Sequence, residues 1–180
     1  MAEEASRIRR PELLTAEHDV SAFCSGRHSS LDDWLRDRAL ASEGLSARTY
    51  VICAGGERFR VIGYYAISTA MEQRIALPNA KLRRGMPERV PLLLIGRLAV
   101  DAPHQGRGIG TALLSDALRR CLAASNIVGA RGIVAHAIDD DALGFYRRRG
   151  FLSSPLGERV VVMPIETLRV LFAGDRRTSN

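Results

Sequence analysis

The stretch PLLLIGRLAVDAPHQGRGIGTALL, residues 91–114, decides the fold. It opens with a nearly continuous apolar run from Leu92 to Val100, the pattern of a strand buried on both faces. A short polar turn leads to the glycine-rich run Gln105–Gly110, and an amphipathic helical pattern follows at once. Strand, glycine-rich turn and helix together favour phosphate binding, because the glycines let a ligand approach the backbone and the first N–H groups of the helix have no internal partner.

Two familiar phosphate-binding motifs do not fit this loop. A Walker loop needs a Lys-Ser/Thr pair after its second glycine, whereas Thr111 follows Gly110 and no lysine is near. A dinucleotide fingerprint reads G-x-G-x-x-G, and this loop reads G-x-G-x-G. Because a plain tight turn also uses glycine, the loop alone leaves that alternative open.

A second motif lies further along the chain, where residues 139–151 read DDDALGFYRRRGF. Its aspartates are typical of a helix N-cap and first turn, and Gly150 is typical of a helix end. In this order the two motifs resemble the GNAT family of acyl-CoA N-acyltransferases. The matches to the family's Gln/Arg-x-x-Gly-x-Gly/Ala loop and N-x-x-A-x-x-F/L-Y-x-x-x-G-F segment are Gln105, Gly108, Gly110, Ala142, Phe145, Tyr146, Gly150 and Phe151. Asp139 stands where asparagine is common, which leaves a contact from this side chain to the cofactor open.

The length of 180 residues and the hydrophobic content of 46% predict a single domain over residues 1–180. The resemblance implies a mixed α/β sandwich with the GNAT fold. In this fold the fourth and fifth strands, here Leu92–Val100 and Gly132–Ala137, splay apart within a mixed central sheet flanked by helices. Residues 1–10 lack the apolar core of a signal peptide, and Gly96 and Arg97 interrupt the longest apolar run. We therefore expect a cytoplasmic protein without a membrane partner.

The remaining patterns predict the elements around this centre. They are a helix from Leu31 to Glu43 capped by Ser29 or Ser30, a hairpin of Tyr50–Ala54 and Phe59–Ile67 joined by Gly55 and Gly56, a further pairing near Ile75, a charged loop at Asn79–Arg89, a helix after the glycine loop closed by Gly129, and a last strand at Val160–Met163.

The cysteines, the histidines and the net charge indicate which ligands and partners to expect. The widely spaced Cys24, Cys53 and Cys121 predict buried, reduced thiols, and the four histidines form no metal-binding spacing, so we expect no metal. The net charge of +6, from 26 basic and 20 acidic residues, suits a polyanionic partner. An arginine-rich composition without such a partner is the alternative.

The resemblance implies acetyl-CoA as the acetyl donor, lying in the gap between the splayed strands. Its pantetheine would pair with strand backbone and its pyrophosphate would lie on the N–H groups of Gly106–Thr111. The implied contacts are Leu98, Ala99, Val100, Gln105, Gly106, Arg107, Gly108, Ile109, Gly110, Thr111 and Phe145. Tyr146 is the implied general acid, because a phenol carries a proton at pH 7 and can give it to the departing thiolate. A core aromatic is the alternative for Tyr146.

No side chain stands out as the general base. Many family members carry an acid on the fourth strand where this chain has Arg97, and His136 on the fifth strand is a candidate with a simpler structural explanation. An amine of low pKa needs no base, because enough of it is neutral at pH 7. The amino group of an amino acid esterified to tRNA is such an amine, since the ester withdraws electrons.

Longer runs at residues 14–40, 61–69, 96–110 and 142–151 resemble the GNAT toxins of bacterial toxin–antitoxin pairs. Those enzymes acetylate the α-amine of aminoacyl-tRNA and inhibit translation. The resemblance implies aminoacyl-tRNA as substrate, a ribbon-helix-helix antitoxin, DNA contact only through the antitoxin complex, and a homodimer. The implied tRNA-binding arginines are Arg83, Arg84, Arg97 and Arg36. We also expect the Arg97 cation to disfavour protonation of the incoming amine.

Two other functions stay open. An ordinary GNAT acetyltransferase would act on a small-molecule amine or a protein N-terminus, and the net charge of +6 together with Arg97 argues against it. A GNAT-shaped binding module would not catalyse, and Tyr146 with its glycine loop argues against that.

Overall fold

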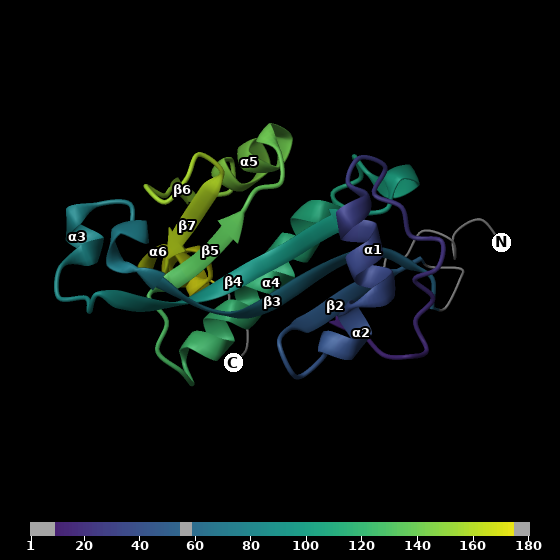
Figure 1. The fold of residues 1–180 in the computed structure, drawn as a ribbon, viewed down its shortest axis with the longest axis horizontal. Coiled ribbons are helices and arrows are strands. Elements are labelled where there is room, and N and C mark those ends of the chain that lie inside the picture. Colours follow the sequence, from purple (N-terminus) through teal and green to yellow (C-terminus); the bar gives the residue numbers. More distant parts are fainter. Residues whose placement is uncertain (1–9, 55–58, 175–180) are drawn as a thin grey trace. The chain divides into compact units, whose positions relative to one another are not determined.

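The computed structural model describes residues 10–54 and 59–174. Within this part of the chain the strands form one mixed sheet in the order β1-β2-β3-β4-β5-β7-β6 (Figure 1). The strands are β1 (Glu12–Leu13), β2 (Arg48–Cys53), β3 (Val61–Gln73), β4 (Arg89–Val100), β5 (Gly132–His136), β6 (Leu152–Ser153) and β7 (Val160–Pro164). The pairing of β4 with β5 is parallel, whereas β1–β2, β2–β3, β5–β7 and β6–β7 are antiparallel. The predicted mixed α/β fold is confirmed.

Helices connect these strands. They are α1 (Ser29–Asp37), α2 (Ala39–Ser42), α3 (Ala80–Arg83), α4 (Ile109–Ser125), α5 (Asp140–Arg147) and α6 (Ile165–Leu171), with 3-10 turns at Arg74–Ala76 and Ala102–His104. None of the helices in the described ranges has the length and apolar character needed to cross a lipid bilayer.

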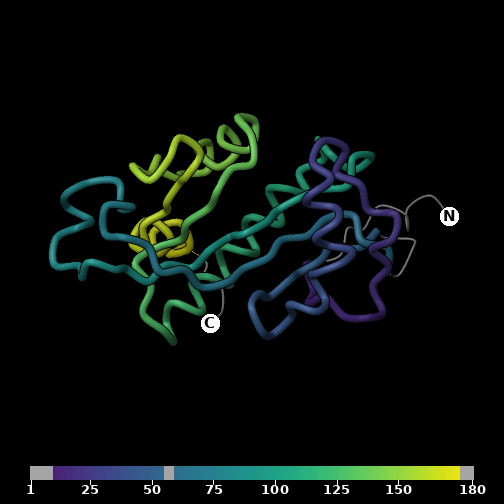
Figure 2. Tube along the Cα trace, in the orientation of Figure 1, coloured from purple at the N-terminus to yellow at the C-terminus, as the bar shows by residue number. Residues whose placement is uncertain are grey.

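The chain divides into two compact units. The first contains Met1–Ser68 and Gly96–Ala117, and the second contains Thr69–Ile95 and Leu118–Asn180. Three elements, β3, β4 and α4, each continue from one unit into the other (Figure 2). A single domain over residues 1–180 therefore stays a prediction.

Two neighbouring tyrosines show how the first unit is layered. Successive residues of a strand point to opposite faces of the sheet, so Tyr64 and Tyr65 on β3 lie on different sides. The Tyr64 hydroxyl donates to the carbonyl of Leu31 on α1 at 2.8 Å, and the Tyr65 hydroxyl donates to Asp116 on α4 at 2.5 Å. The sheet of this unit is therefore covered by α1 on one face and by the start of α4 on the other. The buried cluster on the α1 side contains Leu14, Phe23, Leu35, Ala39, Val51, Cys53, Val61, Tyr64 and Ala99.

The second unit is built around β5, whose residues from Gly132 to Ala135 are all buried. Its core cluster joins Leu77, Val90, Leu92, Val134 and Val162. A bidentate pair between Arg131 and Glu166, at 2.7 and 2.9 Å, connects the start of β5 to α6.

Several element boundaries differ from the sequence prediction. The predicted helix Leu31–Glu43 is two helices that begin at Ser29, because Arg38 adopts φ −123° and interrupts the helical backbone. Its N-cap is His28, and neither Ser29 nor Ser30 caps it. The apolar face of Leu31, Trp34, Leu35 and Ala39 is nevertheless correct, since all four pack in or against the first core.

Other local predictions were correct only in part. Ile75 itself lies in a 3-10 turn, while the strand pairing predicted near it is that of β3 with β4, which Arg74 N–H extends by donating to Glu88 O at 2.7 Å. The charged loop contains α3, whose N-cap Asn79 accepts from Leu82 N–H at 3.1 Å. Helix α4 ends at Ser125, before Gly129. The hairpin of β2 and β3 is confirmed, while its Gly55–Gly56 turn lies outside the described residues.

The expectation of three buried thiols was wrong at one position. Cys53 and Cys121 are buried, and burial raises the pKa of Cys121 to about 12, but Cys24 is exposed. Cys24 is exposed because it lies in the irregular segment before α1, where its backbone and not its side chain is anchored.

Gly132 is expected to be intolerant of any side chain. A Cβ at this position would lie 2.5 Å from the Met163 carbonyl oxygen on β7, and backbone atoms in a paired strand cannot yield cheaply. Gly132→Ala should lower the free energy of unfolding by ~1–3 kcal/mol or more. Gly129→Ala is the control, because a Cβ there would meet nothing within 4 Å. Urea unfolding of both variants tests this, and equal stabilities would contradict the crowding argument.

Candidate active site

The backbone of the glycine loop in the first unit is compatible with phosphate binding. Gly106 and Gly108 adopt φ values of +72° and +81°, a region that side chains disfavour, and a Cβ on either would meet no atom within 4 Å. The space above the loop is therefore open to a ligand. The N–H of Ala112 donates to Gly108 O at 3.0 Å, so the N–H groups before it lie at the N-terminal end of the 17-residue helix α4. This arrangement fits an anionic pyrophosphate.

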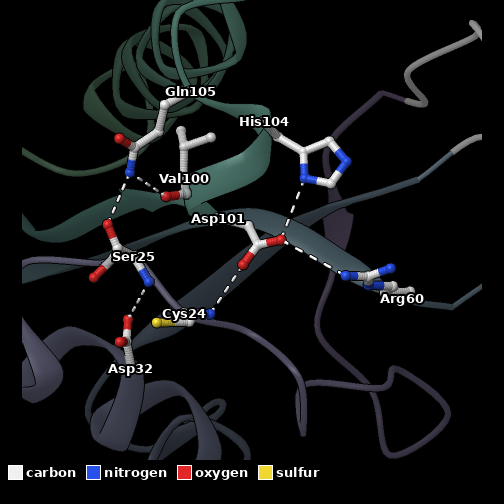
Figure 3. A network of polar contacts seen from close by, with 8 residues as sticks. All are labelled: Cys24, Ser25, Asp32, Arg60, Val100, Asp101, His104 and Gln105. Atoms are coloured by element: carbon white, nitrogen blue, oxygen red, sulfur yellow. Dashed lines mark hydrogen bonds and ion pairs between the residues drawn. The ribbon is translucent and has the colours of Figure 1, made fainter.

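The other loop residues predicted to bind the cofactor differ in how far they are buried. Ile109 is buried and anchors the first turn of α4, while Gly110 is half-buried. Arg107 and Thr111 are exposed. Gln105 is exposed as a residue, but both donors of its amide are used by backbone carbonyls (Figure 3).

The ladder between β4 and β5 covers only part of β4. Its ladder with β5 pairs Leu93, Leu94 and Ile95 with Ile133–Ala135 and stops there. The following residues of β4, from Gly96 to Val100, have no ladder partner in β5. Ala99 is buried, and Leu98 and Val100 are half-buried.

Tyr146 lies on α5 in the second unit with its ring between two other aromatic rings. The ring centroids of Phe145 and Phe151 are 5.4 and 5.2 Å away, both in edge-to-face arrangements. Only 5% of Tyr146 is exposed, and burial raises the pKa of its phenol above the ordinary value. Its hydroxyl has no hydrogen-bond partner among the described residues. A protonated, unpartnered phenol is suited to donate a proton to a substrate.

Two side chains fix α5, which carries Tyr146. Asp139 accepts a hydrogen bond from Ala142 N–H at 2.7 Å, so it is the N-cap of α5. At the other end, Arg149 donates to Phe145 O at 2.9 Å and its guanidinium lies 3.8 Å from the centroid of the Phe145 ring. The Asp139 carboxylate thus has a structural role where the family commonly has asparagine.

The four predicted tRNA-binding arginines have different environments. Arg83 donates to Leu77 O at 2.8 Å, while Arg84 is exposed and makes no ion pair within the described chain. The guanidinium of Arg97 lies over the Trp34 ring, 4.3 Å from its centroid. Arg36 donates to Phe23 O at 2.8 Å and to Asp33 at 2.7 Å. Arg36 and Arg97 belong to the first unit, and Arg83 and Arg84 to the second.

Glu12, His18 and Cys53 form the group in the described ranges whose potential metal-ligand atoms come within 4.8 Å of one another. The Thr15 N–H donates to His18 Nδ1 at 3.0 Å, so the neutral ring carries its proton on Nε2, which donates to Glu12 at 3.1 Å. A metal-binding histidine instead donates from its second nitrogen. The group therefore fits a hydrogen-bonded histidine, and the absence of a metal stays a prediction.

Sequence reasoning missed two residues that organise the first unit. Trp34 was assigned only to an apolar helix face, yet it stacks on Tyr64 at 5.9 Å and lies under Arg97. Asp101 was treated as part of a polar turn, yet it is 2% exposed and binds Cys24 N–H at 2.9 Å. The position of Asp101 directly after the buried strand was the available signal.

The first unit carries a glycine turn after a strand whose ladder stops short, and the second carries a buried tyrosine on a capped helix; each is a feature expected of an acyl-CoA-dependent N-acetyltransferase. The model of the acetyltransferase (GNAT) family matches residues 12–151, and the chain belongs to this family.

Known proteins resemble the chain over nearly its whole length. A tRNA-acetylating toxin of Mycobacterium tuberculosis (strain ATCC 25618 / H37Rv) is 40% identical over 163 residues, covering 90% of this chain and 95% of the relative. The structure of AtaT complexed with acetyl-methionyl-tRNAfMet has a TM-score of 0.84 at 27% identity, covering 92% and 99%. A tyrosine-to-phenylalanine variant of the AtaT toxin, bound to the C-terminus of the antitoxin AtaR and to acetyl-CoA, has a TM-score of 0.77 at 26% identity, covering 93% and 99%.

Proposed function

We propose that this N-acetyltransferase is the toxin of a toxin–antitoxin pair and acetylates the α-amine of aminoacyl-tRNA, which inhibits translation. The observation that carries the proposal is the 40% identity with a tRNA-acetylating toxin across 90% of the chain. The match to AtaT in complex with an acetylated, charged tRNA supports the same substrate class.

The chemistry follows from the residues present. Acetyl-CoA supplies a thioester whose carbonyl the free amine attacks, so that a C–N bond forms and the C–S bond breaks. The proposed phosphate contacts are the N–H groups of Gly106–Thr111, which suit an anion because of their place at the helix N-terminus. The backbone of Leu98, Ala99 and Val100 is proposed to pair with the pantetheine arm. The Tyr146 hydroxyl gives its proton to the departing sulfur, and the proton of the amine passes to water.

A basic surface for the tRNA is proposed on α3 and its flanks. Arg84 and Lys81 are exposed there, whereas Arg83 uses its guanidinium to hold the backbone at Leu77. Arg131 also donates to the Leu82 carbonyl, at 3.4 Å. We therefore assign phosphate contact first to Arg84, and assign Arg83 to keeping α3 in place.

The first unit contributes two further cations to this proposal. Arg97 lies over Trp34, where an aromatic face fixes its guanidinium, and we propose that it disfavours protonation of the incoming amine. Arg36 is the second, at the surface of α1. The proposed partners also include a ribbon-helix-helix antitoxin, DNA through the antitoxin complex, and a second copy of the chain in a homodimer. The proposed location is cytoplasmic.

Arg84→Glu should reduce acetylation of charged tRNA, because it replaces a phosphate-binding cation by an anion. Transfer from labelled acetyl-CoA to total charged tRNA measures this, with deacylated tRNA and a panel of polyamines and peptides as other acceptors. The loss of one phosphate contact should lower the slope of log affinity against log salt by about one unit. The choice of tRNA should not change, because phosphate contacts do not read sequence.

Arg169→Glu is the matched control, since Arg169 is also exposed in the second unit but lies on α6. It should leave transfer close to the native rate. Rapid turnover of a small amine that neither variant affects would overturn the tRNA proposal and favour an ordinary acetyltransferase.

A further inference from the structure

An irregular segment in the first unit, Cys24–Ser25, is held from several sides by the network of Figure 3. Gln105 Nε2 donates to Ser25 O and to Val100 O, each at 2.9 Å. On the opposite side, Ser25 N–H donates to Asp32 Oδ1 on α1 at 2.8 Å. The carbonyl oxygen of Ser25 is thus bound by the glycine loop, and its N–H group is bound by α1.

Asp101 anchors Cys24, the residue before Ser25, in the same way. Its Oδ1 accepts from Cys24 N–H at 2.9 Å, and the N–H of Ala102 donates back to Cys24 O at 2.8 Å. Its Oδ2 lies 3.2 Å from His104 Nδ1 and 3.9 Å from Arg60. Asp101 and Asp32 are only 2% and 5% exposed, and buried carboxylates are costly unless they are hydrogen-bonded. Both are therefore held firmly in these positions.

The Gln105 amide is fully engaged. A primary amide has two N–H donors, and here both meet carbonyl oxygens, which fixes which side of the amide faces them. These donors are not available to a pyrophosphate. The family pattern alone implied cofactor contact for Gln105, whereas its contacts indicate a role in positioning the loop.

We propose that Gln105 and Asp32 are positioning residues of a latch, formed with Ser25 and Asp101. This latch holds the glycine loop in a fixed position relative to α1. The inference rests on the proposed function, because it takes the loop as the acetyl-CoA site. Helix α1 carries Arg36, which donates at 2.8 Å to Phe23 O, directly before this segment. The latch therefore connects the cofactor side of the first unit with a residue assigned to the substrate.

Asp32 lies outside the glycine loop, and we nevertheless expect it to affect the affinity for acetyl-CoA. Among the described residues, Asp32 is linked to the glycine loop by hydrogen bonds through Ser25, and its removal should weaken acetyl-CoA binding. One hydrogen bond of this kind corresponds to about a three- to tenfold change in Kd. Because Gln105 and Asp32 act through one residue, losing both should cost no more than the larger single loss.

Calorimetry with acetyl-CoA tests this on the full chain. Gln105→Met keeps the length of the side chain and removes both donors, and Asp32→Ala removes the acceptor. Each should raise Kd about three- to tenfold, and the double variant should match the larger single effect. Asp32→Asn retains an acceptor oxygen and should restore near-native affinity. Asp37→Ala is the control on α1, because Asp37 is exposed and carries the same charge.

Hydrogen exchange gives a second readout that does not depend on the Asp32 variant folding. In Gln105→Met the Ser25 amide should exchange faster, although Gln105 does not bond that amide. Acetyl-CoA should slow the same amide in the native protein. Three results would each overturn the latch while leaving the proposed function intact. They are native acetyl-CoA affinity in a folded Asp32→Ala, multiplicative losses of affinity in the double variant, and unchanged exchange of the Ser25 amide in Gln105→Met. A native protein that does not bind acetyl-CoA would overturn both.

Discussion

Replacing Tyr146 by phenylalanine is expected to reduce acetyl transfer by about 10²–10⁴-fold, the usual contribution of a positioned general acid. The fold should survive, because the ring keeps its edge-to-face contacts with Phe145 and Phe151. The hydroxyl has no hydrogen-bond partner among the described residues, so its removal should cost little stability. Rates from single-turnover assays, together with calorimetric acetyl-CoA affinity, separate chemistry from binding.

The pH dependence follows from the burial of the same ring. An ordinary tyrosine titrates near pH 10. Burial raises the pKa of Tyr146 further, because a phenolate is poorly solvated there, so the acid form persists above pH 10. The rate should therefore show no decline from loss of this proton between pH 7 and about 10. Tyr50→Phe is the control, because it removes the same phenolic hydroxyl group from a tyrosine on β2. A near-native rate for Tyr146→Phe would reduce Tyr146 to a packing residue.

The parts of the site that were predictable from sequence are those that local chemistry determines. Glycines at positions 106 and 108 are needed for positive φ, and both have it. An aspartate at the start of a helical pattern predicts a cap, and Asp139 is one. In both cases a short run of residues contains the whole signal, so neighbouring sequence is sufficient.

The parts that were not predictable depend on residues far apart in the chain. Gln105 lies 80 positions from Ser25, and Asp101 lies 77 positions from Cys24, so no local pattern indicates either contact. The same holds for the arginines. A charged loop predicts exposed cations, but whether a guanidinium meets solvent or a backbone carbonyl depends on how the loop folds, and that distinguishes Arg84 from Arg83.

Element boundaries failed for a related reason. The apolar spacing of residues 31–43 is helical throughout, and it does not reveal the interruption at Arg38. Helix α6 was missed because it follows β7 directly, and its N-cap Pro164 makes no side-chain cap hydrogen bond. Periodicity thus identified which residues enter the core but did not locate where each helix begins and ends.

Gly108→Glu is expected to abolish measurable acetyl-CoA binding at concentrations that saturate the native protein. Gly108 has φ +81°, and holding a side chain there costs ~1–3 kcal/mol, so the loop would leave the conformation that aims its N–H groups at an anion. The new carboxylate would also enter the open space above the loop and repel a pyrophosphate. Calorimetric titration with acetyl-CoA measures the loss directly.

Two further variants separate the causes. Gly108→Ala carries the backbone cost without the charge, and should weaken binding by roughly 5- to 150-fold, the range that ~1–3 kcal/mol represents. Gly129→Glu makes the same substitution at an exposed position outside the loop, where a Cβ meets nothing within 4 Å, and should bind like the native protein. If Gly108→Glu bound acetyl-CoA with native affinity, the loop would be only a tight turn. The pyrophosphate would then have to be held elsewhere in the chain.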